Sequence, residues 1–280
     1  MKKIALVTDS TSDLTPEMVE QHNVHVMPLK INFPDQQYVD GELTSEAFYI
    51  KLAAAEKLPT TSQPAPEEFS KLYGNLLEDY DEVLSIHISS GLSGTFNAAR
   101  LAAEEYPGQV HLVDSLSISL GTGIMVTEAA KGIAKGLSPG EIIQQLGITR
   151  NNLETVFTLD TLEYLQKGGR IGRVAGMVGS LLNIKPVIRV DDDGIYVPAG
   201  KARSRQKALA TVVDVFVKQA AGRKAALLAV AHGAAAEAGM MLKEQLESAL
   251  GIKCQVFTQV GPVIGVHTGP GTIGAAVLFQ

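Results

Sequence analysis

The stretch SIHISSGLSGTFNAAR, residues 85–100, decides the fold class of this chain. It opens as a short apolar run typical of a buried strand, turns through Gly91 and Gly94, and continues as an alanine-rich helical pattern. A strand that leads directly into a helix is the first half of a β-α-β unit. Units of this kind build a mostly parallel sheet with helices on both faces.

The same alternation continues on both sides of this stretch. Toward the N-terminus the sequence predicts a strand at 3–10, a helix at 14–23, an extended run at 24–33, a helix at 44–57 and a helix that begins at Pro66. Toward the C-terminus it predicts a strand at 109–115 and helices at 123–136 and 138–152. Thr15 and Pro16 are of the types preferred at a helix N-cap and first helical position. Residues 1–159 are therefore predicted to form an α/β domain.

The pattern changes near residue 160. A strand at 155–161 is expected to be the last of the first domain, and the small-residue-rich segment 162–183 has a helical pattern. The sequence then predicts a hairpin at 185–200, a helix at 203–222, a strand at 225–233, a helix at 235–251, a strand at 254–260 and two terminal glycine-rich strands. The hairpin is indicated by two apolar runs around Asp193-Gly194. Residues 160–280 are therefore predicted to form a smaller α+β domain.

Composition and charge exclude several functional classes. The 24 lysine and arginine residues against 30 aspartate and glutamate residues give a net charge of −6, which argues against a nucleic-acid partner. The N-terminal apolar run covers only Ile4–Val7, and no stretch approaches the roughly 18 residues that a membrane span needs. We therefore expect a cytoplasmic protein. The single cysteine, Cys254, excludes an internal disulfide and a cysteine-based zinc site.

No cofactor or metal is expected either. The sequence GPGTIG at 269–274 matches the dinucleotide-binding pattern, but only six residues follow it, too few for the required helix. His22 and His25 lie three residues apart, but they straddle a predicted helix end and have no third metal ligand nearby in the sequence.

The turn within residues 85–100 is a candidate anion-binding site. Ser93, Gly94 and Thr95 lie where the strand ends and the helix begins, and the free N–H groups of a helix start attract phosphate or carboxylate. Open α/β sheets also bind their ligands at the carboxyl ends of strands. Plain N-capping by Ser93 or Thr95 is the simpler interpretation of the same residues.

Two further segments carry polar groups that suit a ligand oxygen. Thr60, Thr61 and Ser62 form a hydroxyl cluster between two prolines, although they also suit a linker that caps the next helix. His267 lies between an apolar strand-like run and a Gly-Pro-Gly turn, where it can donate to a carboxylate, act as a base, or simply end a strand.

A serine hydrolase or acyltransferase is an alternative function. The sequence GLSGT approaches the nucleophile elbow G-x-S-x-G, with Thr95 in place of the last glycine. Ser93 would then be the nucleophile, with His267 and Asp114 available as base and acid.

Six motifs together resemble the DegV family of bacterial fatty-acid-binding proteins. They are VTDSTSDL at 7–14, TTSQPAPEEF at 60–69, SSGLSGTFNAA at 89–99, VDS at 113–115, LEYLQKGGRI at 162–171 and GPVIGVHTGPGTIG at 261–274. Each motif is weak alone, but their order matches the family, and the resemblance covers essentially the whole chain.

The resemblance implies an acyl carrier rather than an enzyme. In this family an α/β domain joins a smaller α+β domain, and one long-chain fatty acid lies in a tunnel between them. The resemblance implies a carboxylate held by Thr61 and Ser93, with Ser62, Gly94, Thr95 and His267 close by. It implies no cofactor, and it implies that the carrier presents the carboxylate to a separate fatty acid kinase.

The segment KGGRIGR is a candidate contact for that kinase or, transiently, for an anionic membrane. Lys167, Arg170 and Arg173 are spaced by three residues, and residues at that spacing share one face of a helix. We therefore expect them to form a single cationic patch, unless they are simply a solvated helix end.

Overall fold

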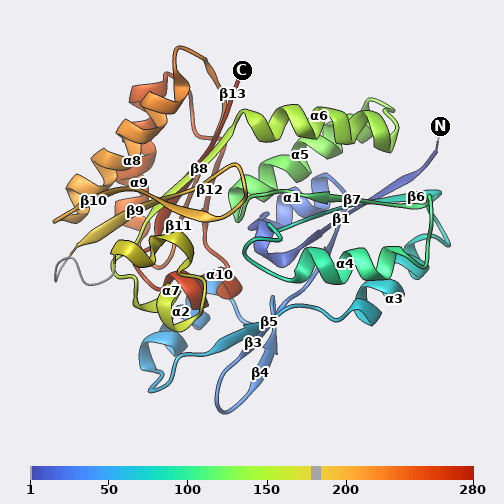
Figure 1. Ribbon diagram of the computed structural model, residues 1–280, viewed down its shortest axis with the longest axis horizontal. Coiled ribbons are helices and arrows are strands. Elements are labelled where there is room, and N and C mark those ends of the chain that lie inside the picture. The colour runs from blue at the N-terminus through green and yellow to red at the C-terminus, as the bar shows by residue number, and fades with distance from the viewer. Residues whose placement is uncertain (1, 178–183) are drawn as a thin grey trace.

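The computed structural model describes residues 2–177 and 184–280. Within these residues the chain forms three β-sheets, and Figure 1 shows the first and second sheets side by side with the small third sheet below them. The last six residues of the predicted helical segment 162–183 lie outside the described residues. The rest of that segment contains α7 (Glu163–Lys167) and the 3-10 helix η2 (Gly172–Met177).

The first sheet is parallel, as predicted. Its order is β2-β1-β6-β7, and its strands are β1 (Ile4–Asp9), β2 (Val24–Met27), β6 (Glu82–His87) and β7 (Val110–Asp114). The 3-10 helix η1 (Ser10–Ser12) and α1 (Pro16–Gln21) follow β1. Thr15 caps α1 through a hydrogen bond from the Met18 amide, and Pro16 occupies its first turn.

Helices cover both faces of this sheet because its strands are apolar on both sides. Alternate residues of β1, Ala5 and Val7, pack against α3 (Pro66–Leu76) and α4 (Thr95–Ala103). The residue between them, Leu6, lies in the opposite core with α5 (Leu120–Ala134) and α6 (Pro139–Asn151).

The second sheet has the order β10-β9-β8-β13-β11-β12. Its strands are β8 (Leu153–Thr158), β9 (Lys185–Val190), β10 (Tyr196–Ala202), β11 (Ala225–His232), β12 (Val256–Gln259) and β13 (Ile273–Phe279). The predicted hairpin is present as the antiparallel pair β9–β10. One face of this sheet packs against α8 (Arg205–Ala220) and α9 (Ala236–Leu250).

The placement of β8 differs from the prediction. It was expected as the last strand of the first domain, but it pairs antiparallel with β13 and β9 inside the second sheet. The sequence of a strand shows its apolar character but not its partner, which lies 115 residues further along the chain where Thr158 pairs with Ile273. The division at residue 160 stays a prediction.

The third sheet is small and antiparallel. It contains β3 (Lys30–Asn32), β4 (Gln37–Val39) and β5 (Thr60–Ser62) in the order β4-β3-β5. It packs with α2 (Ser45–Ala54) and α10 (Pro262–Thr268) around a separate apolar cluster. The hydroxyl cluster Thr60–Ser62 is therefore a strand, not a linker.

Helix α10 corrects the prediction of a strand before His267. Pro262 starts this helix, and Val263, Ile264, Gly265 and Val266 are all buried. Because the helix is buried on every side, its residues show no amphipathic period, and a short apolar run then looks like a strand.

One continuous apolar core joins the first and second sheets. It contains the face of the first sheet opposite α3 and α4 and the face of the second sheet opposite α8 and α9. Leu84 and Ile86 from β6, Phe157 from β8 and Ala231 from β11 all belong to it. In residues 2–177 and 184–280 no helix is long and apolar enough to cross a membrane.

Candidate ligand-binding site

Two small cavities lie in the core between the first and second sheets. The inner cavity has a volume of about 40 Å³, and the polar cavity has a volume of about 30 Å³. Each has room for only a few water molecules. The inner cavity is lined by Ile118, Ser119, Leu120, Thr155, Val156, Phe157, Tyr196, Ala231, Val260, Ile264, Thr268, Thr272, Gly274, Ala275 and Ala276. The polar cavity is lined by Thr11, Leu29, Thr61, Ile88, Leu92, Ser93, Ile118, Arg170, Tyr196, Val263, Ile264 and His267.

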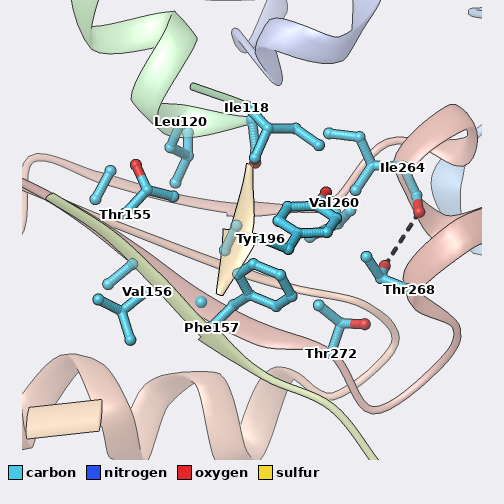
Figure 2. A pocket seen from close by; sticks show the side chains of 15 residues that line it. Ile118, Leu120, Thr155, Val156, Phe157, Tyr196, Val260, Ile264, Thr268 and Thr272 are labelled. Atoms are coloured by element: carbon cyan, nitrogen blue, oxygen red, sulfur yellow. Dashed lines mark hydrogen bonds between the residues drawn. The ribbon is translucent and has the colours of Figure 1, made fainter. Parts of the chain in front are cut away.

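The inner cavity is apolar because of how the strands of the second sheet alternate (Figure 2). On β11, Leu228 and Val230 pack toward α8 and α9, while the alternate residues Ala229 and Ala231 face the core between the sheets. On β13, Val277 packs toward α8 and α9, while the neighbouring Ala276 faces the core between the sheets. On these two strands, larger residues therefore pack on the outer face, and alanines leave space on the inner face. Such a space suits an aliphatic chain.

The polar cavity brings together three of the residues singled out in the sequence. Thr61 comes from β5, Ser93 from the turn before α4, and His267 from α10. The Thr61 hydroxyl hydrogen bonds with His267 Nε2 at 2.7 Å. The Ser93 hydroxyl hydrogen bonds with the Thr95 hydroxyl at 2.8 Å and accepts from the Thr95 N–H at 3.3 Å.

The other three predicted carboxylate contacts, Ser62, Gly94 and Thr95, do not line this cavity. Side chains alternate along β5, so Ser62 points away from Thr61 and lies 3.4 Å from the Asn32 amide. Gly94 is the N-cap of α4, and a side chain there would collide with Gln63. The glycine thus lets the β5 segment approach the Ser93 turn. Thr95 is fully buried and contacts Ser93.

His267 is neutral at neutral pH. Burial, aided by the charge of Arg170, lowers the pKa of its imidazole to about 4. Its Nδ1 is buried with no hydrogen-bond partner in the described parts of the chain. Buried N–H groups without an acceptor are rarer than unpaired acceptors, so we assign the proton to Nε2. His267 then donates to Thr61, which leaves the Thr61 hydroxyl proton free for a ligand oxygen.

Arg170 supplies the positive charge of the site. Its guanidinium donates to the carbonyl oxygens of Gly168 at 2.9 Å and Leu92 at 3.5 Å, and its side chain lines the polar cavity. Within residues 2–177 and 184–280 these carbonyls are its hydrogen-bond partners, and no carboxylate pairs with it. Arginine pairs well with a carboxylate because its planar fork offers two parallel N–H donors.

The prediction that Lys167, Arg170 and Arg173 share one helix face is wrong. Helix α7 ends at Lys167, and Gly169 has a φ of +71°, which turns the chain out of the helix. Lys167 pairs with Glu163 at 2.6 Å, and Arg173 pairs with Asp191 at 2.9 Å. Each cation therefore faces a different part of the molecule, and only Arg170 lines the polar cavity.

A groove of about 540 Å³ leads from the surface to this site. Thr61, Arg170 and His267 line both the groove and the polar cavity, and Lys167 lies on the groove wall. These three side chains are therefore reachable from outside the protein.

The geometry required for hydrolase chemistry is not formed around Ser93. Its hydroxyl pairs with Thr95, His267 pairs with Thr61, and Asp114 accepts from the Ser90 and Leu116 amides. A Ser-His-Asp series does occur elsewhere. His87 hydrogen bonds with Ser85 at 2.7 Å and with Asp9 at 3.0 Å.

That series is structural, because all three residues are fully buried. Asp9 also accepts hydrogen bonds from the Ile88 N–H at 3.0 Å, the Thr11 N–H at 3.0 Å and the Thr11 hydroxyl. Burial alone raises the pKa of the Asp9 carboxyl, but these hydrogen bonds and His87 outweigh it and hold the pKa below its ordinary value. The carboxylate fixes Thr11 at the wall of the polar cavity.

Sequence reasoning missed Thr11 and Tyr196, and it assigned Arg170 to a different surface. Thr11 had a usable signal, because DSTSD follows β1 at the same sheet edge as SSGLS follows β6, and carboxyl ends of parallel strands meet there. Tyr196 had no such signal in the sequence, since it belongs to a hairpin whose position against the first sheet is set only by tertiary packing.

Asp13 ties three wall segments of the two cavities together. Its carboxylate accepts a hydrogen bond from the Ser119 hydroxyl and another from the Gly261 N–H, which lies at 2.9 Å where α10 begins. Burial raises the pKa of Asp13 to about 7, despite the lowering effect of these two hydrogen bonds, and Asp40 and Asp9 add to the rise.

We expect Asp13 to make stability fall as pH rises. The native carboxyl keeps its proton up to about pH 7, whereas the unfolded one loses it near pH 4. The native state therefore binds more protons between these values, and this contribution to the unfolding free energy is lost as pH rises through about 7. Urea unfolding at pH 5 and pH 8 measures it. Asp13→Asn should show a smaller pH 5 to pH 8 difference than the parent protein, and an equal difference would contradict the assignment.

Comparison with known proteins places this architecture in a family. The protein-family model described as "Uncharacterised protein, DegV family" matches residues 3–280 of this chain. A DegV domain-containing protein from Deinococcus radiodurans is 41% identical over 278 residues, covering 98% of each chain.

Solved structures show the same similarity in three dimensions. A fatty-acid-binding DegV family protein from Thermus thermophilus is 38% identical with a TM-score of 0.94, covering 99% of this chain and 100% of its own. A stearic-acid-binding protein from Eubacterium ventriosum is 30% identical with a TM-score of 0.91, covering 100% and 98%. Sequence and fold agree over essentially the full length, and the chain belongs to the DegV family.

Proposed function

We propose that this protein binds one long-chain fatty acid, with the carboxylate in the polar cavity and the acyl chain directed into the inner cavity. One observation carries the proposal. The hydroxyls of Thr61 and Ser93 and the guanidinium of Arg170 line a cavity that borders directly on an apolar one between the two sheets. The Thermus thermophilus and Eubacterium ventriosum proteins, which share this fold, are fatty-acid-binding proteins.

The energetics of such a ligand favour tight binding without a cofactor. Each buried methylene contributes about 0.8 kcal/mol, so about 14 methylenes contribute on the order of 11 kcal/mol before the cost of ordering the chain is subtracted. The carboxylate must keep its hydrogen bonds when it leaves water. The Thr61 and Ser93 hydroxyls and the Arg170 guanidinium provide donors of the right kind at one place.

The decisive experiment is extraction of the purified protein with organic solvent, followed by mass spectrometry and by titration of the stripped protein with palmitate and oleate. We expect about one fatty acid per chain. If the extract contains none and neither acid binds, the proposed function is wrong.

The hydroxyls of Thr61 and Ser93 are expected to contribute strongly to affinity. Each of Thr61→Val and Ser93→Ala removes one donor to a charged oxygen, which costs about 1.5–3 kcal/mol and corresponds to a roughly 10- to 150-fold higher Kd. Calorimetric titration with palmitate measures the change. Ser62→Ala is the matched control, because Ser62 lies on the other face of the same strand. If Ser62→Ala weakens binding as much as Thr61→Val, the orientation of β5 at the site is wrong.

The proposal includes presentation of the carboxylate to a separate fatty acid kinase. In that reaction a carboxylate oxygen attacks the γ-phosphorus of ATP and the bond to the departing ADP breaks, which yields an acyl phosphate. The surface groove supports this role, because it reaches Thr61, Arg170 and His267 from outside. A contact of the same surface with an anionic membrane during ligand exchange, and a cytoplasmic location beside the ATP supply, belong to the same proposal.

Lys167 is the residue we assign to the kinase contact, since it lies on the groove wall and is not part of the polar cavity. Lys167→Ala should keep fatty-acid affinity within a few-fold but lower acyl phosphate formation with kinase and ATP. High salt should produce the same defect because exposed charges are screened. Lys218→Ala, on the outer helix α8, is the control. If Lys167→Ala supports acyl phosphate formation at the parent rate, Lys167 is not part of the kinase contact.

A further inference from the structure

The two cavities are separated by a thin wall of three side chains. Ile118, Tyr196 and Ile264 line both the inner and the polar cavity. They come from the loop before α5, from β10 and from α10. The carboxylate donors Thr61, Ser93 and Arg170 all lie on the polar side of this wall. An acyl chain anchored at these donors reaches the inner cavity only by passing between the three side chains.

Tyr196 is the rigid member of this wall. Only 3% of its surface is exposed, and its ring lies edge-on to Phe157 with a centroid separation of 5.2 Å and an interplanar angle of 71°. Figure 2 shows the ring between Phe157 on one side and Ile118 and Val260 on the other. Because the ring is planar, it moves as one body when the side chain rotates between its staggered positions.

The hydroxyl of Tyr196 has no hydrogen-bond partner in the part of the chain that the structure describes. Within residues 2–177 and 184–280 it forms no hydrogen bond, and the contacts of the ring are van der Waals and aromatic. Among the described residues, a rotation of the side chain therefore breaks no hydrogen bond of the hydroxyl. The backbone stays fixed during such a rotation, because Tyr196 pairs with Val190 in the β9–β10 ladder.

The volumes show why movement is needed. With about 30 Å³, the polar cavity accommodates a carboxylate and few methylenes, and the inner cavity adds about 40 Å³. An acid too long for the polar cavity must displace the wall of Ile118, Tyr196 and Ile264. Each methylene that passes this wall is then buried in apolar surroundings. The site thus treats short and long acids differently.

We propose that Tyr196 is a gate between the two cavities that determines the acyl chain length this protein selects. Acids that end before the wall bind without moving the ring. Longer acids must rotate it away from Phe157, and they bind tightly because the inner cavity then buries the rest of the chain. This inference rests on the proposed function, since it concerns the same ligand.

The test is a chain-length series of saturated acids from hexanoate to stearate, measured by stopped-flow association and by titration. In the parent protein we expect a break, with little gain per methylene in short acids and a steady gain in long ones. In Tyr196→Leu we expect palmitate to associate at least tenfold faster, with hexanoate unchanged. Tyr196→Phe keeps the ring and should retain both the break in the chain-length series and the slow association of palmitate.

Each outcome decides between named possibilities. If the gain per methylene is constant along the series and Tyr196→Leu associates like the parent, there is no gate. If Tyr196→Phe matches Tyr196→Leu, the hydroxyl and not the ring controls entry, and the gate is wrong. If Tyr196→Leu does not fold, the break in the parent series still tests the proposal. If no acid of any length binds the parent, the proposed function itself has failed.

Discussion

Replacing Arg170 with glutamine is expected to raise the Kd for palmitate by roughly 30- to 5,000-fold. Arg170 is the cation that lines the polar cavity, while His267 beside it is neutral because its pKa is lowered to about 4. Removing one partner of a buried, hydrogen-bonded charge pair costs about 2–5 kcal/mol, which gives that range of Kd. The Kd of Arg170→Lys should lie between those of the parent protein and Arg170→Gln, because lysine keeps the charge but cannot donate two parallel hydrogen bonds as arginine does.

Arg173→Gln is the matched control for this prediction. Arg173 lies three residues away and is 58% exposed, and it pairs with Asp191 and Asp193 rather than lining the cavity. We expect it to bind palmitate like the parent protein. Unchanged affinity in Arg170→Gln would remove Arg170 from the proposed carboxylate site.

Replacing Asp9 with alanine is expected to lower the free energy of unfolding by about 3–5 kcal/mol, the typical cost of breaking a buried pair by removing one partner. The change leaves His87 and the amides of Thr11 and Ile88 buried without their acceptor. Urea unfolding at neutral pH measures the loss.

The control for Asp9 is Asp193→Ala. Asp193 is 72% exposed and its pair with Arg173 is 3.4 Å long, so its removal should cost at most about 1 kcal/mol. The pH dependence gives a second readout. Because the native pKa of Asp9 is lowered, its contribution is present above about pH 4 and is lost as pH falls below that value. A loss under 1 kcal/mol in Asp9→Ala would show that the buried network does not stabilise the fold.

Local signals in the sequence predicted much of the fold. Thr15 and Pro16 mark the start of α1, and Pro66 marks the start of α3, because capping depends on residues within one turn. The strand-turn-helix pattern around Ser93 predicted the parallel sheet for the same reason. Helix α10 escaped prediction because it is short and buried on all sides, so burial and not amphipathic period determines its sequence.

The hydroxyl and histidine segments were also recognisable in the sequence, as polar groups beside strand ends. Which of their side chains meet was decided only by the tertiary structure. Thr61 contacts His267 across 206 residues of chain, and Asp13 contacts Gly261 across 248. Ser62, one residue from Thr61, points the other way because strand side chains alternate.

The sequence by itself therefore determined the fold class, the family resemblance and several of the segments that line the polar cavity, since these depend on patterns of neighbouring residues. The tertiary structure decided that β8 joins the second sheet, that Arg170 lines the polar cavity and that Tyr196 lies between the two cavities. The physical reason is that strand partners and cavity walls are set by packing between segments far apart in the chain, and neighbouring residues carry no information about it.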